Sequence, residues 1–289
     1  METSTVLVVG ATGGIGSQVV PELLARGVHV RAMTRTPERA ASLPDGAEPV
    51  VADLHDQRAV TTALRGVDAV FLNSPSAPDA AEGQIRFAER VRSAGVPRLV
   101  LLSQYAARAD SPVRFLRWHA AVESFVSTLG LREWTTLRPN LFMQGVLNFA
   151  GVIRAERRFG APIGEAPVSL IDTRDIAAAA AVVLTEPGHS GRTYTLTGPR
   201  AVTHAEIARA LSDATGHRIT FADMSPADFA AAMHQMLPPW QADGLVEDYA
   251  HYARGEAADV YTDLTDLTGQ PARDLTDFAR DHAAAFTPA

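Results

Sequence analysis

The sequence of 289 residues lacks both cysteine and lysine. Without cysteine, the chain can form no disulfide, no thiolate nucleophile and no cysteine-ligated zinc centre. All 26 residues counted as lysine or arginine are arginine, so the chain carries no side-chain ammonium group. This absence excludes Schiff-base chemistry, the lysine of a Walker-type phosphate loop and every proton relay that depends on a lysine.

Basic charge is also scarce relative to acidic charge, since the formal net charge is −7 and the isoelectric point is about 5.7. This balance disfavours binding to nucleic acid or to an anionic membrane. No apolar run approaches the roughly 20 residues that span a bilayer. The segment Met1–Ser4 does not resemble the basic start of a signal peptide. We therefore expect a cytoplasmic protein that binds neither nucleic acid nor membrane.

The motifs of metal sites and of common hydrolases are missing as well. The nine histidines include no pair spaced three or four residues apart, so we expect no metal site. A G-x-S-x-G nucleophile motif is also absent, which excludes the usual hydrolase reading.

What the chain does have is a regular alternation of short Val/Leu-rich runs with longer segments of helical period. We predict strands at Thr5–Val9, His29–Thr34, Glu48–Ala52, Ala69–Asn73, Arg98–Ser103 and Trp134–Arg138. Helices are expected at Ile15–Ala25, Gln57–Leu64, Asp79–Ser93 and Val113–Leu129. The hydrophobic fraction of 46% is enough for a large core. The pattern predicts an α/β fold of Rossmann type, a doubly wound parallel sheet covered on both faces.

The alternation becomes looser after Pro139, which suggests a smaller, mostly helical substrate region near the C-terminus. We expect residues 1–155 to form the nucleotide-binding domain, with 167–200 returning to it, and 156–166 and 201–289 to form the substrate region. Asp172 and Asp175 are interpreted as caps of a helix. The later elements expected are a strand at Thr193–Thr197 and helices at Thr203–Ala214, Ser225–Met236, Gln241–Arg254 and Asp274–Phe286.

A glycine-rich turn, Gly10-Ala-Thr-Gly-Gly-Ile-Gly16, follows the first predicted strand and opens the first predicted helix. Glycine permits a tight exit from the strand, a close approach of backbone to a pyrophosphate and close packing of the helix on the sheet. The unpaired amides and positive dipole end of the helix then bind the anion. The residues expected to contact the nucleotide here are Gly10, Thr12, Gly13, Gly14, Ile15 and Gly16.

The end of the second predicted strand indicates which nucleotide binds. An NAD site places an acidic residue there to bind the ribose hydroxyls, whereas this chain has Arg35. An arginine can bind a 2′-phosphate through bidentate hydrogen bonds, which favours NADP(H) over NAD(H). The alternative is a solvated loop arginine. Asp53 and Leu54 are expected at the adenine, although Asp53 can equally start a loop, and Asn73 and Ser74 at the ribose and nicotinamide side.

Several segments together resemble the NmrA-like group of atypical short-chain dehydrogenases/reductases. They are the G-x-x-G-x-x-G turn, Met-Thr-Arg35, Leu-Leu-Ser103, Leu-Arg138-Pro139-Asn140-Leu-Phe-Met143, Thr195-Leu-Thr-Gly198 and Leu-Thr-Gly269-Gln-Pro271. The resemblance spans nearly the whole chain. The group includes quinone, triphenylmethane dye and isoflavone-type reductases, and also the regulator NmrA. It implies the fold and an NAD(P)(H) cofactor, with Ser103 and Pro139 beside that cofactor.

The resemblance also implies that the usual proton relay is missing. Standard members of the wider short-chain dehydrogenase/reductase superfamily use Tyr-x-x-x-Lys on the helix after the fifth strand, with a serine at the end of that strand. Ser103 matches the serine, but Phe115 stands at the tyrosine position and His119 at the lysine position. Three alternatives remain open. His119 can be the proton donor or a ribose contact, Tyr105 can supply a phenol, or the acceptor takes its proton from water.

Apolar and aromatic residues in the segments that build the substrate pocket of relatives suit a flat hydrophobic ligand. The residues expected to line that pocket are Gln104, Trp118, Asn140, Phe142, Met143, Met236 and Trp240. We predict an NADPH-dependent oxidoreductase that transfers hydride to an apolar aromatic, quinonoid or enone-type acceptor. The alternatives are a non-catalytic NADP(H) sensor that binds a protein partner and a non-redox isomerase. A homodimer is a possible assembly.

Overall fold

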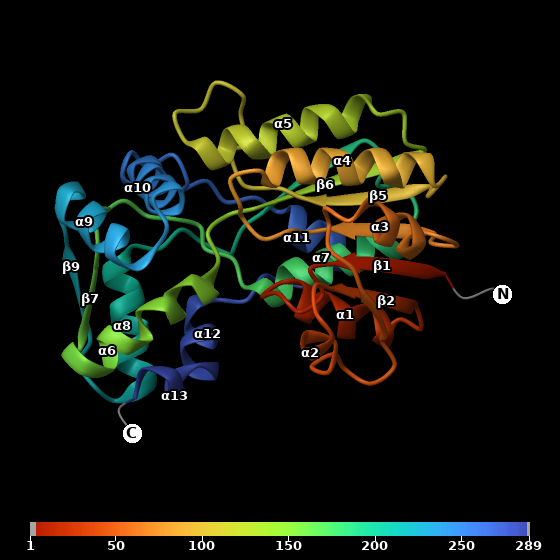
Figure 1. Cartoon of the computed structure of the whole chain (residues 1–289). Coiled ribbons are helices and arrows are strands. Elements are labelled where there is room, and N and C mark those ends of the chain that lie inside the picture. The colour runs from red at the N-terminus through yellow and green to blue at the C-terminus, as the bar shows by residue number, and fades with distance from the viewer. Residues whose placement is uncertain (1–3, 288–289) are drawn as a thin grey trace.

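A parallel seven-stranded sheet forms the centre of the protein in a computed structural model that describes residues 4–287 (Figure 1). The order of its strands is β3-β2-β1-β4-β5-β6-β8, and every neighbouring pair is parallel. The strands are β1 (Thr5–Val9), β2 (His29–Thr34), β3 (Glu48–Val51), β4 (Ala69–Leu72), β5 (Arg98–Leu102), β6 (Glu133–Pro139) and β8 (Arg192–Leu196). This is the predicted doubly wound fold, whose ligands bind beyond the carboxyl ends of the strands where the strand order reverses.

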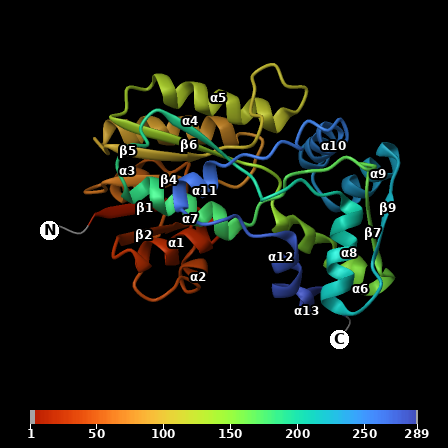
Figure 2. The ribbon, with the colours of Figure 1, turned by 180° about the vertical axis from the view of Figure 1, so that it is seen from behind.

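Helices cover both faces of this sheet (Figure 2). The helices on one face are α1 (Gly16–Ala25) and α7 (Thr173–Thr185), and those on the other are α3 (Gln57–Ala63), α4 (Ala80–Ser93) and α5 (Arg114–Thr128). Within β1, Val6 and Val8 face the first group, while Leu7 and Val9 face the second. Because successive side chains of a strand point to opposite faces, a strand that is covered on both sides consists of consecutive apolar residues.

Most of the remaining elements gather beyond the carboxyl ends of the strands (Figure 1). They are α2 (Pro37–Ala40), η1 (Met143–Phe149), α6 (Ala150–Glu156), β7 (Arg158–Ala161), α8 (His204–Thr215), β9 (Thr220–Asp223), α9 (Pro226–Met236), α10 (Pro239–Ala253), α11 (Asp263–Thr268), α12 (Leu275–Asp281) and α13 (Ala283–Phe286). Two of them lie elsewhere, since α2 flanks β2 and β3 and α11 packs against α7. The others enclose two hydrophobic clusters, one of which includes η1, α8 and α12 and the other α9 and α10.

The predicted elements agree with the observed ones to within one or two residues over most of the chain. Three differences have local causes. The parallel pair β7–β9 was not predicted because each strand has only four residues, too few to show a period. The helix expected at Asp274–Phe286 is interrupted at His282, which separates α12 from α13. The short elements α2, η1, α6 and α11 were also not predicted, since each has seven residues or fewer.

The capping residues confirm the prediction for Asp172 and correct the one for Asp175. The Asp172 carboxylate accepts a hydrogen bond from the Arg174 amide at the start of α7, and Thr203 forms a capping box with Glu206. Asp175 does not cap α7. Its carboxylate accepts a hydrogen bond of 2.8 Å from the Arg273 amide and pairs with the Arg273 guanidinium, so it holds the segment before α12 against the sheet domain. The predicted division at residues 155, 166 and 200 stays a prediction.

No helix in residues 4–287 is long and apolar enough to cross a membrane.

Candidate functional site

The glycine turn between β1 and α1 has the close backbone contacts that its sequence predicts. Gly10 has a φ of +70°, and a Cβ atom there would lie 2.5 Å from the Asn73 carbonyl oxygen. A Cβ on Gly16 would overlap the backbone of Gly10. A Cβ on Gly14, in contrast, would meet no atom within 4 Å. Gly10 and Gly16 therefore close the turn, and Gly14 leaves open space beside it.

The N-terminus of α1 is prepared for an anion. No side chain caps it, and its first turn has no acidic residue. Among the described residues, the amides of Gly14 and Ile15 donate to no acceptor. Unpaired amides at the positive end of a helix bind phosphate, and Gly14 lets a phosphate come close. This arrangement fits the pyrophosphate of a dinucleotide.

A trough with a volume of about 620 Å³ runs along the carboxyl edge of the sheet past this turn. Of the residues expected at the nucleotide, Gly10, Thr12, Gly13, Gly14, Ile15, Arg35, Asp53, Leu54, Asn73 and Ser74 all line it. Gly16 does not, because it is buried where α1 meets the turn. The structure thus brings together residues from the ends of four strands, β1 to β4.

Two arginines lie in the trough at the end of β2. Arg35 and Arg39 are both exposed, and in the part of the chain that the structure describes neither guanidinium forms an ion pair. At the end of β3, Asp53 Oδ1 accepts a hydrogen bond of 2.8 Å from the His55 amide. Asp53 therefore shapes its own loop, as the structural alternative predicted, while also lining the trough. The two guanidinium groups place positive charge in the trough, which Asp53 and Asp79 also line.

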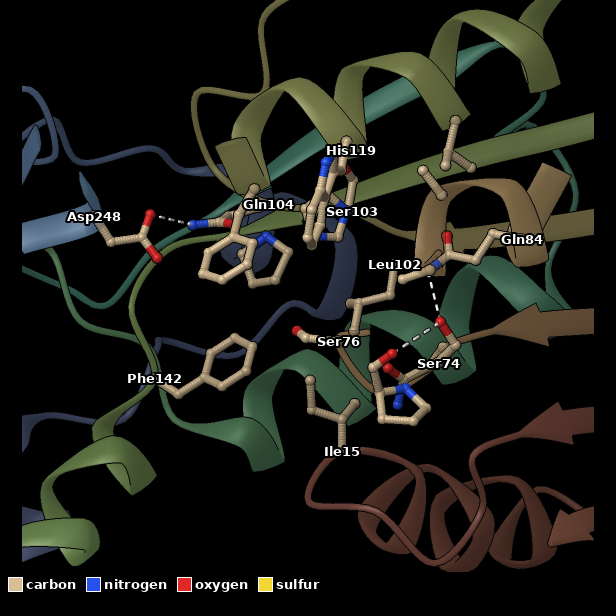
Figure 3. Close-up of a pocket in the computed structure, with 18 of the residues that line it drawn as sticks. Ile15, Ser74, Ser76, Gln84, Leu102, Ser103, Gln104, His119, Phe142 and Asp248 are labelled. Carbon is tan, nitrogen blue, oxygen red and sulfur yellow. Dashed lines mark hydrogen bonds between the residues drawn. The ribbon is translucent and has the colours of Figure 1, made fainter. Parts of the chain in front are cut away.

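The trough continues into a second cavity of about 290 Å³, shown in Figure 3. Six residues line both spaces, namely Ile15, Asn73, Ser74, Pro75, Ala80 and Phe142. At this junction Gln84 donates a hydrogen bond of 2.8 Å to the Ser74 hydroxyl. The other amide atom of Gln84, Oε1, is buried without a partner among residues 4–287. A polar group at the junction is therefore available to a ligand that passes from one space to the other.

The walls of the second cavity come from β5, α4, α5, α10 and the segment after β6. Phe115, Trp118 and Val122 form the α5 wall, and Leu102, Pro139 and Leu141 lie near the sheet. The predicted residues Ser103, Gln104, Trp118, His119, Pro139, Asn140 and Phe142 all line this cavity. No arginine among residues 4–287 lines it, so the acceptor end lacks the guanidinium groups of the trough.

The hydroxyl of Ser103 is engaged by a carboxylate behind the cavity wall. It donates a hydrogen bond to Glu123 on α5, and Glu123 also forms an ion pair of 2.5 Å with Arg138 on β6. Because a hydroxyl has one proton, Ser103 cannot donate to a substrate while it donates to Glu123. The pair also raises the pKa of Arg138, chiefly through its hydrogen bond with Glu123. The sequence argument missed Glu123, which lies four residues after His119 on the same helix face.

His119 lines the cavity with its ring half-buried. Burial lowers the pKa of His119 to about 4, although the Glu123 carboxylate opposes this shift. The imidazole is therefore neutral near pH 7 and can give or accept a hydrogen bond, but it is not present as a cationic acid.

Tyr105 lies away from both cavities. Its ring packs in a cluster with Phe229, Tyr249 and Tyr252 and meets Tyr261 edge to face at a centroid distance of 6.2 Å. Burial raises the pKa of Tyr105 to about 12. Tyr105 is therefore absent from the residues that line either cavity, and its ring is buried in the C-terminal region.

Three of the residues expected to line the substrate pocket do not reach it. Met143 is buried in the cluster beneath η1, and Met236 is 73% exposed at the end of α9. Trp240 packs on Trp118 at 6.2 Å between ring centroids and on Phe115 at 6.4 Å, so it supports the α5 wall from outside. Asn140 borders the cavity, but its amide is bonded to Ser169 and to the Ala257 carbonyl. It therefore secures the scaffold.

Asp248 on α10 is a polar group of the cavity that the sequence argument missed. Its carboxyl is 7% exposed and accepts a hydrogen bond of 3.4 Å from Gln104 Nε2. Burial raises the pKa of Asp248 to about 7. No local motif marks this position, because its partner Gln104 lies 144 residues away.

Comparisons with known proteins identify the family and the cofactor of this chain. The family model described as NAD(P)H-binding matches residues 10–187. The NAD(P)H azoreductase of Xenophilus azovorans is 38% identical over 97% of this chain and 99% of its own length. The (4-alkanoyl-5-oxo-2,5-dihydrofuran-3-yl)methyl phosphate reductase of Streptomyces griseus is 37% identical over 98% and 99%.

The NADPH-dependent quinone oxidoreductase of Escherichia coli, solved with NADPH, has a similar fold. It superposes with a TM-score of 0.86 at 29% identity, covering 96% of this chain and 99% of that one. The predicted Rossmann-type fold, the resemblance to this group of reductases and the nicotinamide nucleotide cofactor are thus confirmed. The chain belongs to the NAD(P)H-binding family and is an NAD(P)H-dependent reductase.

Proposed function

We propose that this protein uses NADPH to reduce small, apolar aromatic, quinonoid or enone-type acceptors. The observation that carries the proposal is the passage, past Ile15 and Phe142, from a trough with two arginines into a cavity that no arginine of residues 4–287 lines. A dinucleotide that lies in the trough reaches the cavity only with its far end. The names of the full-length relatives, an azoreductase and a dihydrofuran phosphate reductase, support acceptors with conjugated double bonds.

The trough residues have distinct proposed roles toward the nucleotide. The amides after Gly13 hold the pyrophosphate, and Arg35, assisted by Arg39, binds the 2′-phosphate that distinguishes NADP(H) from NAD(H). Asp53 and Leu54 border the adenine. Asn73, Ser74, Ser103 and Pro139 border the ribose and nicotinamide. When bound, the cofactor supplies a hydride, one proton with two electrons, to the acceptor.

We propose that the Tyr-x-x-x-Lys relay is absent. The chain has no lysine, and Phe115 and His119 lie four residues apart on α5 beside Ser103. Because His119 is neutral near pH 7, its role is a hydrogen bond to the ribose. Ser103 positions the cavity wall through Glu123.

The direct test mixes the purified protein with NADPH and a panel of quinones, azo compounds and enones, and follows the loss of nicotinamide absorbance. The proposal expects turnover with at least one neutral conjugated acceptor. Tight, redox-selective NADPH binding without turnover of any acceptor supports the sensor and contradicts the proposal. Product formation without net consumption of the cofactor indicates the isomerase.

A further inference from the structure

One face of α10 is brought to the second cavity by a close contact with α5. A Cβ on Gly244 would overlap the ring of Phe115, so only glycine allows the two helices to come this close. Asp248 and Tyr252 follow at intervals of four residues and both line the cavity. Since residues four apart share one face of a helix, Gly244 determines which side chains α10 presents to the acceptor.

An ion pair holds α10 in this position. The Arg114 guanidinium donates to the Glu247 carboxylate at 2.8 Å, and the Arg114 amide donates to the same carboxylate at 2.7 Å. A charge-assisted, multiply bonded pair restricts both rotation and sliding. Asp248, the next residue, is therefore held by the fold at the cavity wall.

The carboxyl group of Asp248 is arranged asymmetrically. Gln104 Nε2 donates to its Oδ1, as the dashed line in Figure 3 shows. In the described part of the chain, Oδ2 has no hydrogen-bond partner. A carboxylic acid whose Oδ1 accepts a hydrogen bond places its proton on Oδ2. The proton then belongs to the oxygen that is free to meet a ligand.

We propose that Asp248 is the proton donor of the reaction, a catalytic residue that protonates the reduced acceptor while Gln104 positions the carboxyl group. This inference rests on the reductase function proposed above. It answers the question left by the missing tyrosine and lysine, and it replaces Tyr105, which lies outside the cavity.

With a neutral quinone as acceptor, a proton from Asp248 completes the reduction. The acceptor gains a hydride, which is one proton with two electrons, from NADPH and becomes an anion with its charge on an oxygen. The O–H bond of Asp248 then breaks, its proton forms a new O–H bond on that oxygen, and the carboxylate regains a proton from water. An azo nitrogen or the enolate of an enone takes a proton in the same way.

The groups around Asp248 favour the protonated acid near neutral pH. Burial raises its pKa to about 7, the Glu247 carboxylate adds to this rise, and the Gln104 hydrogen bond opposes it. Tyr249 and Tyr252 on α10 are protonated because burial raises the pKa of both. His119, which lines the same cavity from α5, is neutral. An acid with a pKa near the working pH is the most effective donor.

The proposal separates two classes of acceptor. A neutral quinone becomes an anion when it receives hydride and needs the proton of Asp248. A cationic triphenylmethane dye becomes neutral when it receives hydride and needs no proton. The requirement for Asp248 should therefore depend on the charge of the acceptor.

The test compares the wild-type protein with D248N in single-turnover reduction of a quinone and of a cationic triphenylmethane dye. We expect the quinone rate of D248N to fall by on the order of 100-fold, so that the ratio of quinone rate to dye rate falls by more than tenfold. The matched control is D213N, an exposed carboxylate on α8, which should leave the ratio unchanged. Equal losses with both acceptors indicate a structural role and overturn the proposal.

A second readout needs no cofactor. The infrared spectrum of the cofactor-free protein at about pH 6 should show a protonated carboxyl band that is absent from D248N and present in D213N. If the three spectra coincide, Asp248 is ionised and cannot donate. If no acceptor is reduced while this band is present, the reductase proposal fails but the protonation of Asp248 stands.

Discussion

The two ends of the ligand space differ in charge and in how the chain builds them. The trough has a helix N-terminus and two arginines, Arg35 and Arg39, that form no ion pair among residues 4–287, all within the first 40 residues. The second cavity is lined by no arginine of the described chain, and it has a neutral His119 and an Asp248 with its pKa raised to about 7. A cationic site suits a cofactor with phosphates, and an uncharged site suits a flat neutral acceptor.

The difference also concerns sequence distance. The trough is lined mainly by the ends of β1 to β4, which follow one another along the chain, and is completed by Phe142, by residues of η1 and by the start of α7. The acceptor cavity depends on contacts between segments more than 100 residues apart, such as Gln104 with Asp248 and Arg114 with Glu247. The following predictions test whether the two ends respond to substitution as differently as they are built.

The largest expected effect is the pH dependence of stability at Asp248. Its folded pKa of about 7 lies above the ordinary aspartate value of about 4, so the folded state binds the proton more tightly. The free energy of unfolding should fall as pH rises from about 4 to about 7, by roughly 4 kcal/mol, and then level off. Urea unfolding of wild type and D248N should show this difference. If the free energy of unfolding depended on pH in the same way in both proteins, the raised pKa of Asp248 in the folded state would be contradicted.

In the glycine turn, two glycines should respond differently to alanine. Gly16→Ala forces a Cβ into the backbone of Gly10 and should lower the free energy of unfolding by about 3 kcal/mol. Gly14→Ala meets no protein atom, so stability should change by less than about 1 kcal/mol. Its Cβ should still weaken NADPH binding, because it occupies the space beside the helix amides. Thermal unfolding and nucleotide titration separate the two effects. The reverse pattern would show that Gly14 does not face the nucleotide.

The choice of nucleotide should depend on one guanidinium. Arg35→Ala should weaken NADPH binding by about 2 kcal/mol, or roughly 30-fold, and leave NADH binding within about twofold. Arg92→Ala removes an exposed arginine of α4 and serves as the matched control. Fluorescence titration of both nucleotides measures the change. Equal losses of NADPH and NADH affinity would rule out a 2′-phosphate contact at Arg35.

The contact between α10 and α5 gives the smallest of these effects. Gly244→Ala should destabilise the protein by about 1–2 kcal/mol because the new methyl group presses on Phe115. The control Gly151→Ala, in α6 with open space around it, should instead stabilise by up to about 1 kcal/mol. Denaturant unfolding of both variants tests this. Stabilisation by both substitutions would mean that α10 does not need the close approach.

These contrasts explain what the sequence could predict. The strands, the glycine turn and Arg35 follow from local patterns, because periodicity and spacing specify each βα unit by itself. The position of Asp248, the group that faces the acceptor, does not follow from a local pattern. Tyr105 lies two residues from Ser103, yet the turn after β5 buries it, whereas Asp248 reaches the cavity through the Gly244–Phe115 contact.

Local signals were also weak where a side chain has two uses. Asp175 resembles a helix cap by position, but it binds Arg273, which lies 98 residues away. Ser103 occupies the expected place, but its hydroxyl donates its hydrogen bond to Glu123. In both cases the residue lies where the sequence predicts, and a distant or unpredicted partner determines what it does.

The most direct test of the account is the pH profile of single-turnover quinone reduction, measured between about pH 5 and pH 9 with saturating NADPH. We predict that the wild-type rate falls above a midpoint near pH 7, where Asp248 loses its proton, and that the lower rate of D248N shows no such descent. The same profile in both proteins would show that the proton comes from elsewhere and would contradict the central claim.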